Sequence, residues 1–418
     1  MGEQRWILSL ILITAAAAPS AAPQAAAPPP PPSSTVEEAL TLDQAFALAA
    51  ANNRTITAAR LRRAVDQAGI DVARERPNPE ARYEQTKETP RQALTASQLL
   101  ELGGKRGRRI ALAQAVARTG EAELARVTAE VRSEVRRAYY GLAAAQARLA
   151  IALDLQSIAG HARDAARERF EVGDVARLEV LQAELLLAQA ENEATAIVGE
   201  REASRSELNA LLGRDPRAPT QVVEEPAETT LPAAEAAATA AMAGNAELAV
   251  LDRQVAEAVA RAALARAQQV PDPTVEGAVT HDAPGEFVWG WRYAVGVAVP
   301  LFTRHRAAVR VEEATIAQLR AQREALVQRL EGAVGSALAR ATTQRQQYLR
   351  YRDEILPRSR EVEAMAQESY RAGQTGLVAL LQALQAAREA RAKAVQAAYD
   401  YQTALAELER AAAVGPPP

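Results

Sequence analysis

The sequence predicts a mainly α-helical fold with a small β part, in which one unit of structure occurs twice. Aromatic residues make up only 4% of the 418 residues, and alanine, leucine, arginine and glutamate dominate. This composition is typical of long helices and coiled coils. No proline interrupts residues 103–215, and the same order of motifs recurs in the second half of the chain. These observations predict duplicated long helical hairpins.

The first 40 residues precede this unit. Arg5 and the apolar run Trp6–Ala18 are followed by small residues, which is the pattern of a secretory signal peptide. We therefore expect a signal peptide at residues 1–18, with a retained signal anchor as the alternative, and a Pro/Ala-rich linker at residues 19–40. No later stretch approaches the roughly 20 apolar residues of a membrane helix. An exported chain that enters a membrane would therefore do so as β-strands.

The duplication defines the rest of the chain. Repeat 1 covers residues 41–213 and repeat 2 covers residues 233–412, with an inter-repeat linker at 214–232 and a disordered tail at 413–418. Each repeat is predicted to begin with one helix of about 30 residues, which ends before a pair of prolines because a proline disfavours helix at the preceding residue. A pair of strands and a very long helical hairpin follow in each repeat.

The strand pair of the second repeat shows the clearest alternation. Residues 287–299 are predicted to pair with residues 274–280 through a turn at 281–286, and a weaker pair lies at residues 81–87 and 93–102, with Pro90 in its turn. The alternation indicates a lipid-facing side with aromatic residues at headgroup level. The alternative is a β-hairpin on a soluble coiled coil. The residues predicted to face lipid are Phe287, Trp289, Trp291, Tyr293, Val295, Val297 and Val299.

The long helical tracts carry apolar residues at three-, four- and seven-residue spacing, for example at Val131, Val135 and Leu142. Gly173 and Gly373 are predicted to turn each tract back on itself, because glycine tolerates the positive φ of a tight turn. A straight helix through each glycine is the alternative. Asp174 suits the N-cap of the returning helix. Pro357 is predicted to kink the second tract, since proline removes a helical hydrogen bond.

About four strands per chain cannot close a barrel, and open sheet edges cannot lie in hydrocarbon. Several copies would therefore have to assemble, and a symmetric ring is the natural closure. Periodicity alone does not choose among two, three or four copies.

The duplicated layout, the Phe170–Gly173 and Tyr370–Gly373 turns and the segment Leu100–Arg106 together resemble the TolC-type outer-membrane efflux proteins. The resemblance implies a homotrimer in the outer membrane of a Gram-negative bacterium, with a twelve-stranded β-barrel and a long periplasmic α-barrel. It also implies two partners, a periplasmic adaptor (membrane fusion protein) and an inner-membrane pump. The segment Glu101–Arg106 is similar to the cobalt-zinc-cadmium resistance branch, which implies divalent cations as cargo. Organic drugs and secreted polypeptides are the competing cargoes.

The resemblance also implies roles for particular residues. The hairpin tips would contact the adaptor, and they correspond to Val172, Gly173, Asp174, Ala372, Gly373 and Gln374. Glu179 and Tyr370 match a tyrosine–carboxylate pair that closes the periplasmic mouth in the family. The family's aspartate positions fall on Ala379 and Gln382, so an acidic ring is not expected there.

Several function classes find no support in the sequence. The three histidines are scattered without metal-ligand spacing, and cysteine is absent, so neither a metal site nor a cofactor nor an enzyme is expected. A net charge of -3 gives no reason to expect nucleic-acid binding. The main rival to a channel is an exported coiled-coil adaptor or scaffold that does not enter the membrane.

Overall fold

The structure, a computed structural model, describes residues 39–223 and 229–412. The expected signal peptide, the expected tail, most of the Pro/Ala-rich linker and part of the inter-repeat linker lie outside these residues. The fold-class prediction is confirmed, because the described residues form long α-helices and one four-stranded antiparallel sheet.

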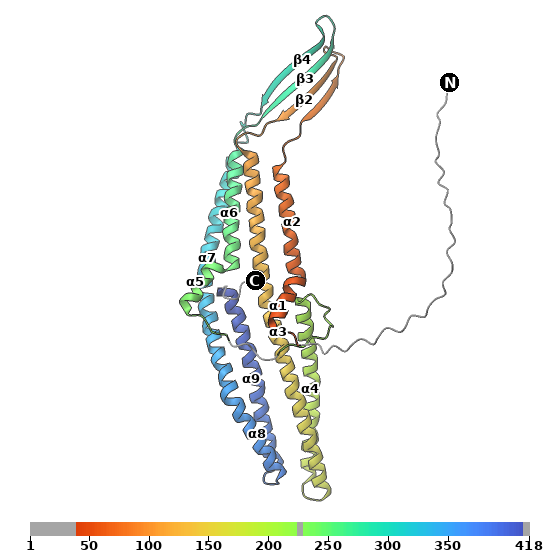
Figure 1. Cartoon of the computed structure of the whole chain (residues 1–418), viewed down its shortest axis with the longest axis vertical. Coiled ribbons are helices and arrows are strands. Elements are labelled where there is room, and N and C mark those ends of the chain that lie inside the picture. The colour runs from red at the N-terminus through yellow and green to blue at the C-terminus, as the bar shows by residue number, and fades with distance from the viewer. Residues whose placement is uncertain (1–38, 224–228, 413–418) are drawn as a thin grey trace, which may run out of the picture. The chain divides into compact units, whose positions relative to one another are not determined.

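The two halves present the same order of elements (Figure 1). The first half contains α1 (Leu42–Asn52), α2 (Arg54–Arg74), β1 (Glu80–Gln85), β2 (Gln92–Leu99), α3 (Lys105–Glu171) and α4 (Arg177–Leu211). The second half contains α5 (Ala234–Gly244), α6 (Ala246–Ala267), β3 (Pro273–Ala283), β4 (Phe287–Val297), α7 (Arg306–Arg350), the π-helical segment η1 (Tyr351–Ile355), α8 (Leu356–Arg371) and α9 (Leu377–Ala412).

Each half begins with two helices, so the prediction of one helix of about 30 residues was wrong. Asn53 ends α1 with an extended backbone, and its side chain accepts hydrogen bonds from Thr55 N at 2.9 Å and Ile56 N at 3.2 Å. Asn245 does the same between α5 and α6, with Glu247 N at 3.0 Å and Leu248 N at 3.1 Å. An N-cap asparagine satisfies amides that a continuous helix would bond to the preceding turn, so it starts a new helix.

The four strands form one sheet in the order β1-β2-β3-β4. The central pair, β2 with β3, joins the two halves, for example through Leu94 opposite Val279. β4 ends at Val297 opposite Pro273, where β3 begins, so the predicted strand residue Val299 lies beyond the strand. Pro271 and Pro273 flank Asp272 at this point; prolines lack the N–H that would extend the ladder.

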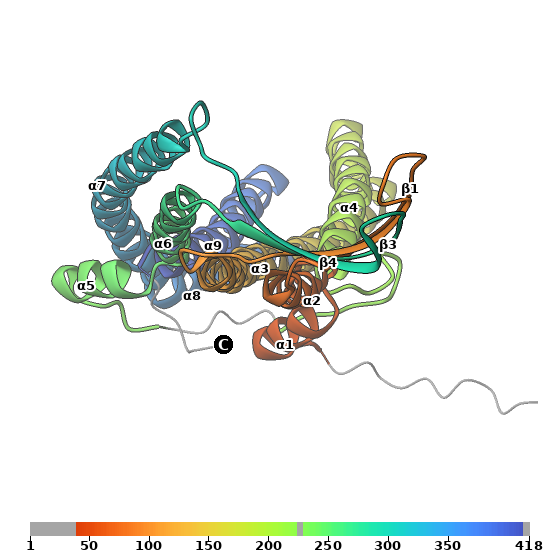
Figure 2. The same ribbon diagram turned by 90° about the horizontal axis from the view of Figure 1, so that it is seen from above.

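The helix α3 has helical neighbours from both halves of the described chain. It packs against α2, α4, α6 and α9, and Figure 2 shows it between α2 and α6. The predicted stripe is buried in its core, with Val135 and Leu142 almost fully enclosed. Most other core positions are alanines, such as Ala159 and Ala166, which let helices approach closely. α3 spans 67 residues, roughly 100 Å at the α-helical rise.

The second long tract is interrupted where the first is continuous. η1 lies immediately before α8, and Leu356 N donates to Tyr351 O, five residues earlier. Pro357 follows in the first turn of α8, whereas the corresponding Ser157 lies inside unbroken α3. Among the described residues, no helix combines the length and the apolar composition that crossing a membrane requires.

Candidate functional site

The sheet has one apolar face that runs across all four strands. Residues paired directly in an antiparallel ladder lie on the same face, so the register extends the Trp291 face of β4 into β3, β2 and β1. One cross-strand row of this face contains Trp291, Val279, Leu94 and Tyr83. A second row contains Tyr293, Gly277, Ala96 and Ala81. Trp291 is 72% exposed and Tyr293 80% exposed, and none of the described helices makes a substantial contact with the sheet. A face of this kind marks an interaction surface.

The opposite face of the sheet is polar and charged. One of its cross-strand rows contains Arg82, Thr95, Ala278 and Arg292. Another row contains Glu80, Ser97, Glu276 and Ala294. Arg292 lies 3.5 Å from Glu276 and Arg82 lies 3.5 Å from Glu84. The strands of the first half, which have weak alternation by themselves, contribute to both faces. Their share of the apolar face contains Gln85, Gln92 and Gln98 as well as the apolar residues of the two rows.

Phe287 does not belong to the apolar face, contrary to the prediction. A Cβ added to Gly290 would lie 2.5 Å from Phe287 Cε2 and 2.7 Å from Thr280 Oγ1, so the Phe287 ring lies on the polar side. Asp282, with φ of 63°, interrupts the ladder just before the turn. Because of this local twist, the Phe287 side chain does not follow the alternating pattern of the strand. Trp289 remains on the apolar face, where its ring contacts His281.

The two helical hairpins turn through the same loop geometry, at the end of the helices away from the sheet (Figure 1). Gly173 has φ of 81° and Gly373 has φ of 70°. In each turn the glycine N–H donates over 3.0 Å, to Phe170 O and to Tyr370 O respectively. The six predicted tip residues, Val172, Gly173, Asp174, Ala372, Gly373 and Gln374, are all exposed. Asp174 does not cap the returning helix as expected; α4 begins after Ala176.

Asp174 instead binds Arg169, and this arginine lies between the two predicted mouth residues. Arg169 Nε donates to Asp174 Oδ2 over 2.7 Å, and Arg169 Nη1 lies 3.6 Å from Glu179 Oε1. Its guanidinium also lies 5.8 Å from the centre of the Tyr370 ring. The bond to Asp174, and then the neighbouring Tyr370, raise the pKa of Arg169 above its ordinary value. The direct Tyr370–Glu179 hydrogen bond is absent within the described chain.

Tyr370 packs the second hairpin against the first. Its ring is buried in a cluster with Ala166 of α3, Ala183 of α4 and Leu380 of α9. Tyr370 Oη and Glu179 Oε1 are both buried without a hydrogen bond among the described residues. Arg169 is the cation that contacts both residues, through its ion pair with Glu179 and its position over the Tyr370 ring.

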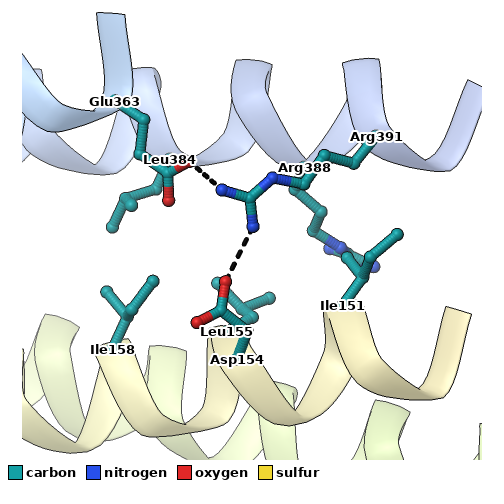
Figure 3. A pocket seen from close by; sticks show the side chains of 8 residues that line it. All are labelled: Ile151, Asp154, Leu155, Ile158, Glu363, Leu384, Arg388 and Arg391. Carbon is teal, nitrogen blue, oxygen red and sulfur yellow. Dashed lines mark hydrogen bonds and ion pairs between the residues drawn. The ribbon is translucent and has the colours of Figure 1, made fainter. Parts of the chain in front are cut away.

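A second contact between the hairpins lies farther from the turns, around a small cavity (Figure 3). Arg391 of α9 donates to Asp154 Oδ2 of α3 over 2.7 Å and also to Glu363 of α8. The Glu363 side chain is 9% exposed, whereas that of Asp154 is 51% exposed. The neighbouring Arg388 bonds to Glu193 of α4. Arginines of the second hairpin thus hold carboxylates of the first.

The sequence prediction did not include Arg169, Arg391 or Glu363. Arg169 could have been found from its place beside the Phe170–Gly173 turn. Arg391 and Asp154 are 237 residues apart, and no local signal pairs them. No cluster of three or more potential metal-ligating side chains occurs among the described residues.

Comparisons with known proteins give the fold a context. The sequence profile of the outer membrane efflux protein family matches residues 46–214 and 237–414. The cobalt-zinc-cadmium resistance protein CzcC of Cupriavidus metallidurans is 32% identical over 177 residues, which is 42% of this chain and 42% of that protein. The match to CzcC therefore spans less than half of either protein.

The fold is similar to those of solved outer-membrane channels. The channel OprN superposes with a TM-score of 0.72 at 21% identity and covers 90% of both chains. The channel CmeC of Campylobacter jejuni gives a TM-score of 0.74 at 16% identity, over 88% of this chain and 85% of that chain. Identities this low describe the fold alone.

Proposed function

The chain belongs to the outer membrane efflux protein family, and we propose that it is the outer-membrane channel of a tripartite efflux system in a Gram-negative bacterium. The observation that carries this proposal is the single-layered sheet, with one apolar and one polar face across all four strands. Such a layer separates lipid from water if its edges are closed. The channel would be a passive conduit that performs no chemistry of its own.

Closure requires further copies of the chain. The sheet ends in two open edges, β1 and β4, and unpaired backbone groups are costly in hydrocarbon. Pairing of β4 with β1 of the next copy would close the sheet into a ring. We propose a homotrimer with twelve strands, in which the signal peptide at residues 1–18 directs export and repeats 41–213 and 233–412 each supply half of one chain's strands.

The hairpin turns form the periplasmic mouth in this proposal. The exposed tips around Gly173 and Gly373 would contact the periplasmic adaptor, which links the channel to an inner-membrane pump. Glu179 and Tyr370 would hold the mouth closed, with Arg169 as the link between them.

The mouth has a direct test. Tyr370→Phe combined with Glu179→Gln removes the hydroxyl and the charge, so single-channel conductance in planar bilayers should rise. Arg169→Gln should raise it as well, because Arg169 contacts both side chains. Arg360→Gln on exposed α8 is the control, and conductance that is unchanged in all three variants would remove these residues from the mouth.

The proposed cargo is divalent metal cations, such as cobalt, zinc and cadmium, which the similarity to CzcC supports. Deletion of the gene should sensitise the cell to these ions in a toxicity panel that also contains copper and organic dyes. If the deletion strain becomes sensitive to dyes alone, the cargo is organic compounds and not metal cations.

An exported coiled-coil scaffold is the rival function. The two differ in their need for detergent, because the apolar sheet face must be covered in a channel. If the mature chain purifies from the periplasm as a monomer without detergent, the channel proposal fails.

A further inference from the structure

The junction between the sheet and the helices carries an unusual set of cations. Four helix ends meet there, because α2 and α6 end beside the starts of α3 and α7, and α2 packs on α3, α3 on α6 and α6 on α7. The side chains of five arginines of this junction, Arg76, Arg108, Arg304, Arg306 and Arg310, are exposed and make no hydrogen bond or ion pair with any described residue. We call them the junction arginines.

Several of the acidic groups near these arginines are already paired with other cations. Lys105 pairs with Asp272 at 2.6 Å, and Arg109 pairs with Glu101 at 2.5 Å. On α7, Glu312 and Glu313 pair with Arg261 and Arg266 of α6. Neither α3 nor α7 has an acidic residue in its first turn. The junction therefore keeps a net positive surface that the chain itself does not neutralise.

Apolar side chains lie directly beside these cations. The segment between β4 and α7 exposes Leu301 by 62% and Phe302 by 98%, and Arg304 follows two residues later. An aromatic ring that is entirely uncovered, next to several arginines, is typical of a segment that enters the lipid interface, where apolar groups reach the acyl chains and cations remain among headgroups.

The length of the apolar face places the same segment at a membrane boundary. Trp289 lies near one end of the face, and the strand from there to its end at Val297 extends roughly 26 Å at the strand rise, or roughly 20 Å along the membrane normal at the usual strand tilt. That is most of the roughly 25 Å height of the apolar band of outer-membrane barrels. Leu301, Phe302 and Arg304 would therefore lie where hydrocarbon gives way to headgroups on the helix side.

We propose that the junction arginines, together with Leu301 and Phe302, bind the phosphates of anionic glycerophospholipids in the inner leaflet of the outer membrane. The inference rests on the proposed function, since it places the sheet in that membrane. Guanidinium groups suit this role because they bind phosphate oxygens in pairs and stay charged at any physiological pH. The lipid would neutralise the surplus charge and cover Phe302, and so fix the depth of the channel.

The test uses the full-length channel extracted in a neutral detergent. Phosphatidylglycerol and phosphatidylcholine with identical acyl chains are titrated separately, and bound lipid is counted by native mass spectrometry. Each arginine near an anionic lipid contributes about fivefold in affinity. The parent channel should therefore prefer phosphatidylglycerol by tenfold or more, on the order of two to three arginines acting together.

The decisive variant is Arg304→Gln/Arg306→Gln/Arg310→Gln, which removes three of the five junction arginines and should reduce the preference for phosphatidylglycerol by about tenfold or more. Its matched control is Arg320→Gln/Arg329→Gln/Arg358→Gln, which removes three exposed arginines farther along α7 and α8 and should keep the preference. Phe302→Gln should weaken binding of both lipids to a similar degree, because it removes only the apolar contact.

Three results would overturn the inference. The parent channel could bind both lipids equally, the junction variant could keep its preference, or inorganic phosphate alone could displace phosphatidylglycerol at equal concentration, which would indicate a free-anion site. Each of these leaves a detergent-extracted oligomer intact, whereas failure of the proposed function would show as a chain that is soluble and monomeric without detergent.

Discussion

Arg391 holds two carboxylates that differ in exposure, and this difference sets how the hairpins can separate. Asp154 belongs to the first hairpin and is half exposed, whereas Glu363 belongs to the same hairpin as Arg391 and is buried. When the hairpins part, Asp154 can be solvated by water at little cost. Glu363 keeps Arg391 as its partner, so no buried charge is left alone.

Substitutions at these residues should have unequal effects on stability. Arg391→Met leaves the buried Glu363 carboxylate without its cation, with only the hydrogen bond that Gln367 Nε2 donates over 3.5 Å, and should cost about 3–5 kcal/mol. Asp154→Asn removes a solvent-exposed pair and should cost less than about 1 kcal/mol. Thermal unfolding followed by circular dichroism in detergent measures both. The double variant Arg391→Met/Glu363→Gln is the control and should recover much of the loss; equal effects of the two single variants would contradict this account.

Asp272 links the second half of the chain to the start of α3. It accepts hydrogen bonds from Leu102 N at 2.9 Å and Lys105 Nζ at 2.6 Å. Burial acts to raise the pKa of Asp272, but the hydrogen bonds from Lys105 and Leu102 hold this pKa below its ordinary value. The ionised carboxylate is therefore favoured by folding.

The pH dependence follows from this direction. Because folding lowers the pKa of Asp272, its ionised carboxylate stabilises the fold fully at pH values above the unfolded pKa of about 3.9. This stabilisation is lost as the pH falls through the pKa of Asp272 in the folded chain. Asp272→Asn should lower stability by about 1–3 kcal/mol at pH 7 and have little effect at pH 2. Unfolding at both pH values provides the measurement, with exposed Asp71→Asn as control. A loss of equal size at pH 2 would rule out the ionised pair as its origin.

At the scale of elements, Pro357 makes the two hairpins mechanically different. The first long helix runs without interruption from the sheet to its turn, whereas the second passes through a π-helical segment before α8. The proline has no N–H for the carbonyl four residues before it. The π-helical bond from Leu356 to Tyr351 accommodates that loss.

Replacing the proline should restore a regular helix. Pro357→Ala returns a backbone donor and should increase local helix stability by up to about 3 kcal/mol. Hydrogen exchange of residues 351–357 should then slow towards the rate of α3. The reciprocal variant, Ser157→Pro, should speed exchange in the middle of α3. If Pro357→Ala exchanges as fast as the parent protein, the π-helical segment has another cause.

At the scale of the whole molecule, the single sheet has two faces with different surroundings. Trp291→Asp places a carboxylate in the middle of the apolar face, at a cost of a few kcal/mol if lipid covers it. Oligomer yield in outer-membrane fractions should fall sharply. Thr95→Asp puts the same charge on the polar face opposite Arg82 and should assemble normally. Equal yields from the two variants would place the lipid elsewhere.

The elements with local signals could be predicted from the sequence. The apolar stripe of α3 follows helical spacing, the glycines at 173 and 373 supply the positive φ of two turns, and the residues of β4 alternate with a period of two. Each of these signals depends on neighbours within a few residues. The Asn53 and Asn245 caps are local signals as well, and each begins the helix that ends before a proline pair, α2 or α6. The prediction of one first helix in each repeat did not include the short helix before each asparagine, α1 or α5.

Contacts between residues that are distant in the sequence became visible in the folded chain alone. The pairing of β2 with β3 merged two hairpins into one sheet and gave the weakly alternating first pair its two faces. The contacts of Arg169 with Tyr370 and of Arg391 with Asp154 join segments far apart in the chain. Val299 lies outside its predicted strand because the ladder ends where its partner strand begins, and Phe287 lies off the apolar face because the positive φ of Asp282 twists the chain beside the turn. Register and packing between segments depend on geometry that no short stretch of sequence encodes.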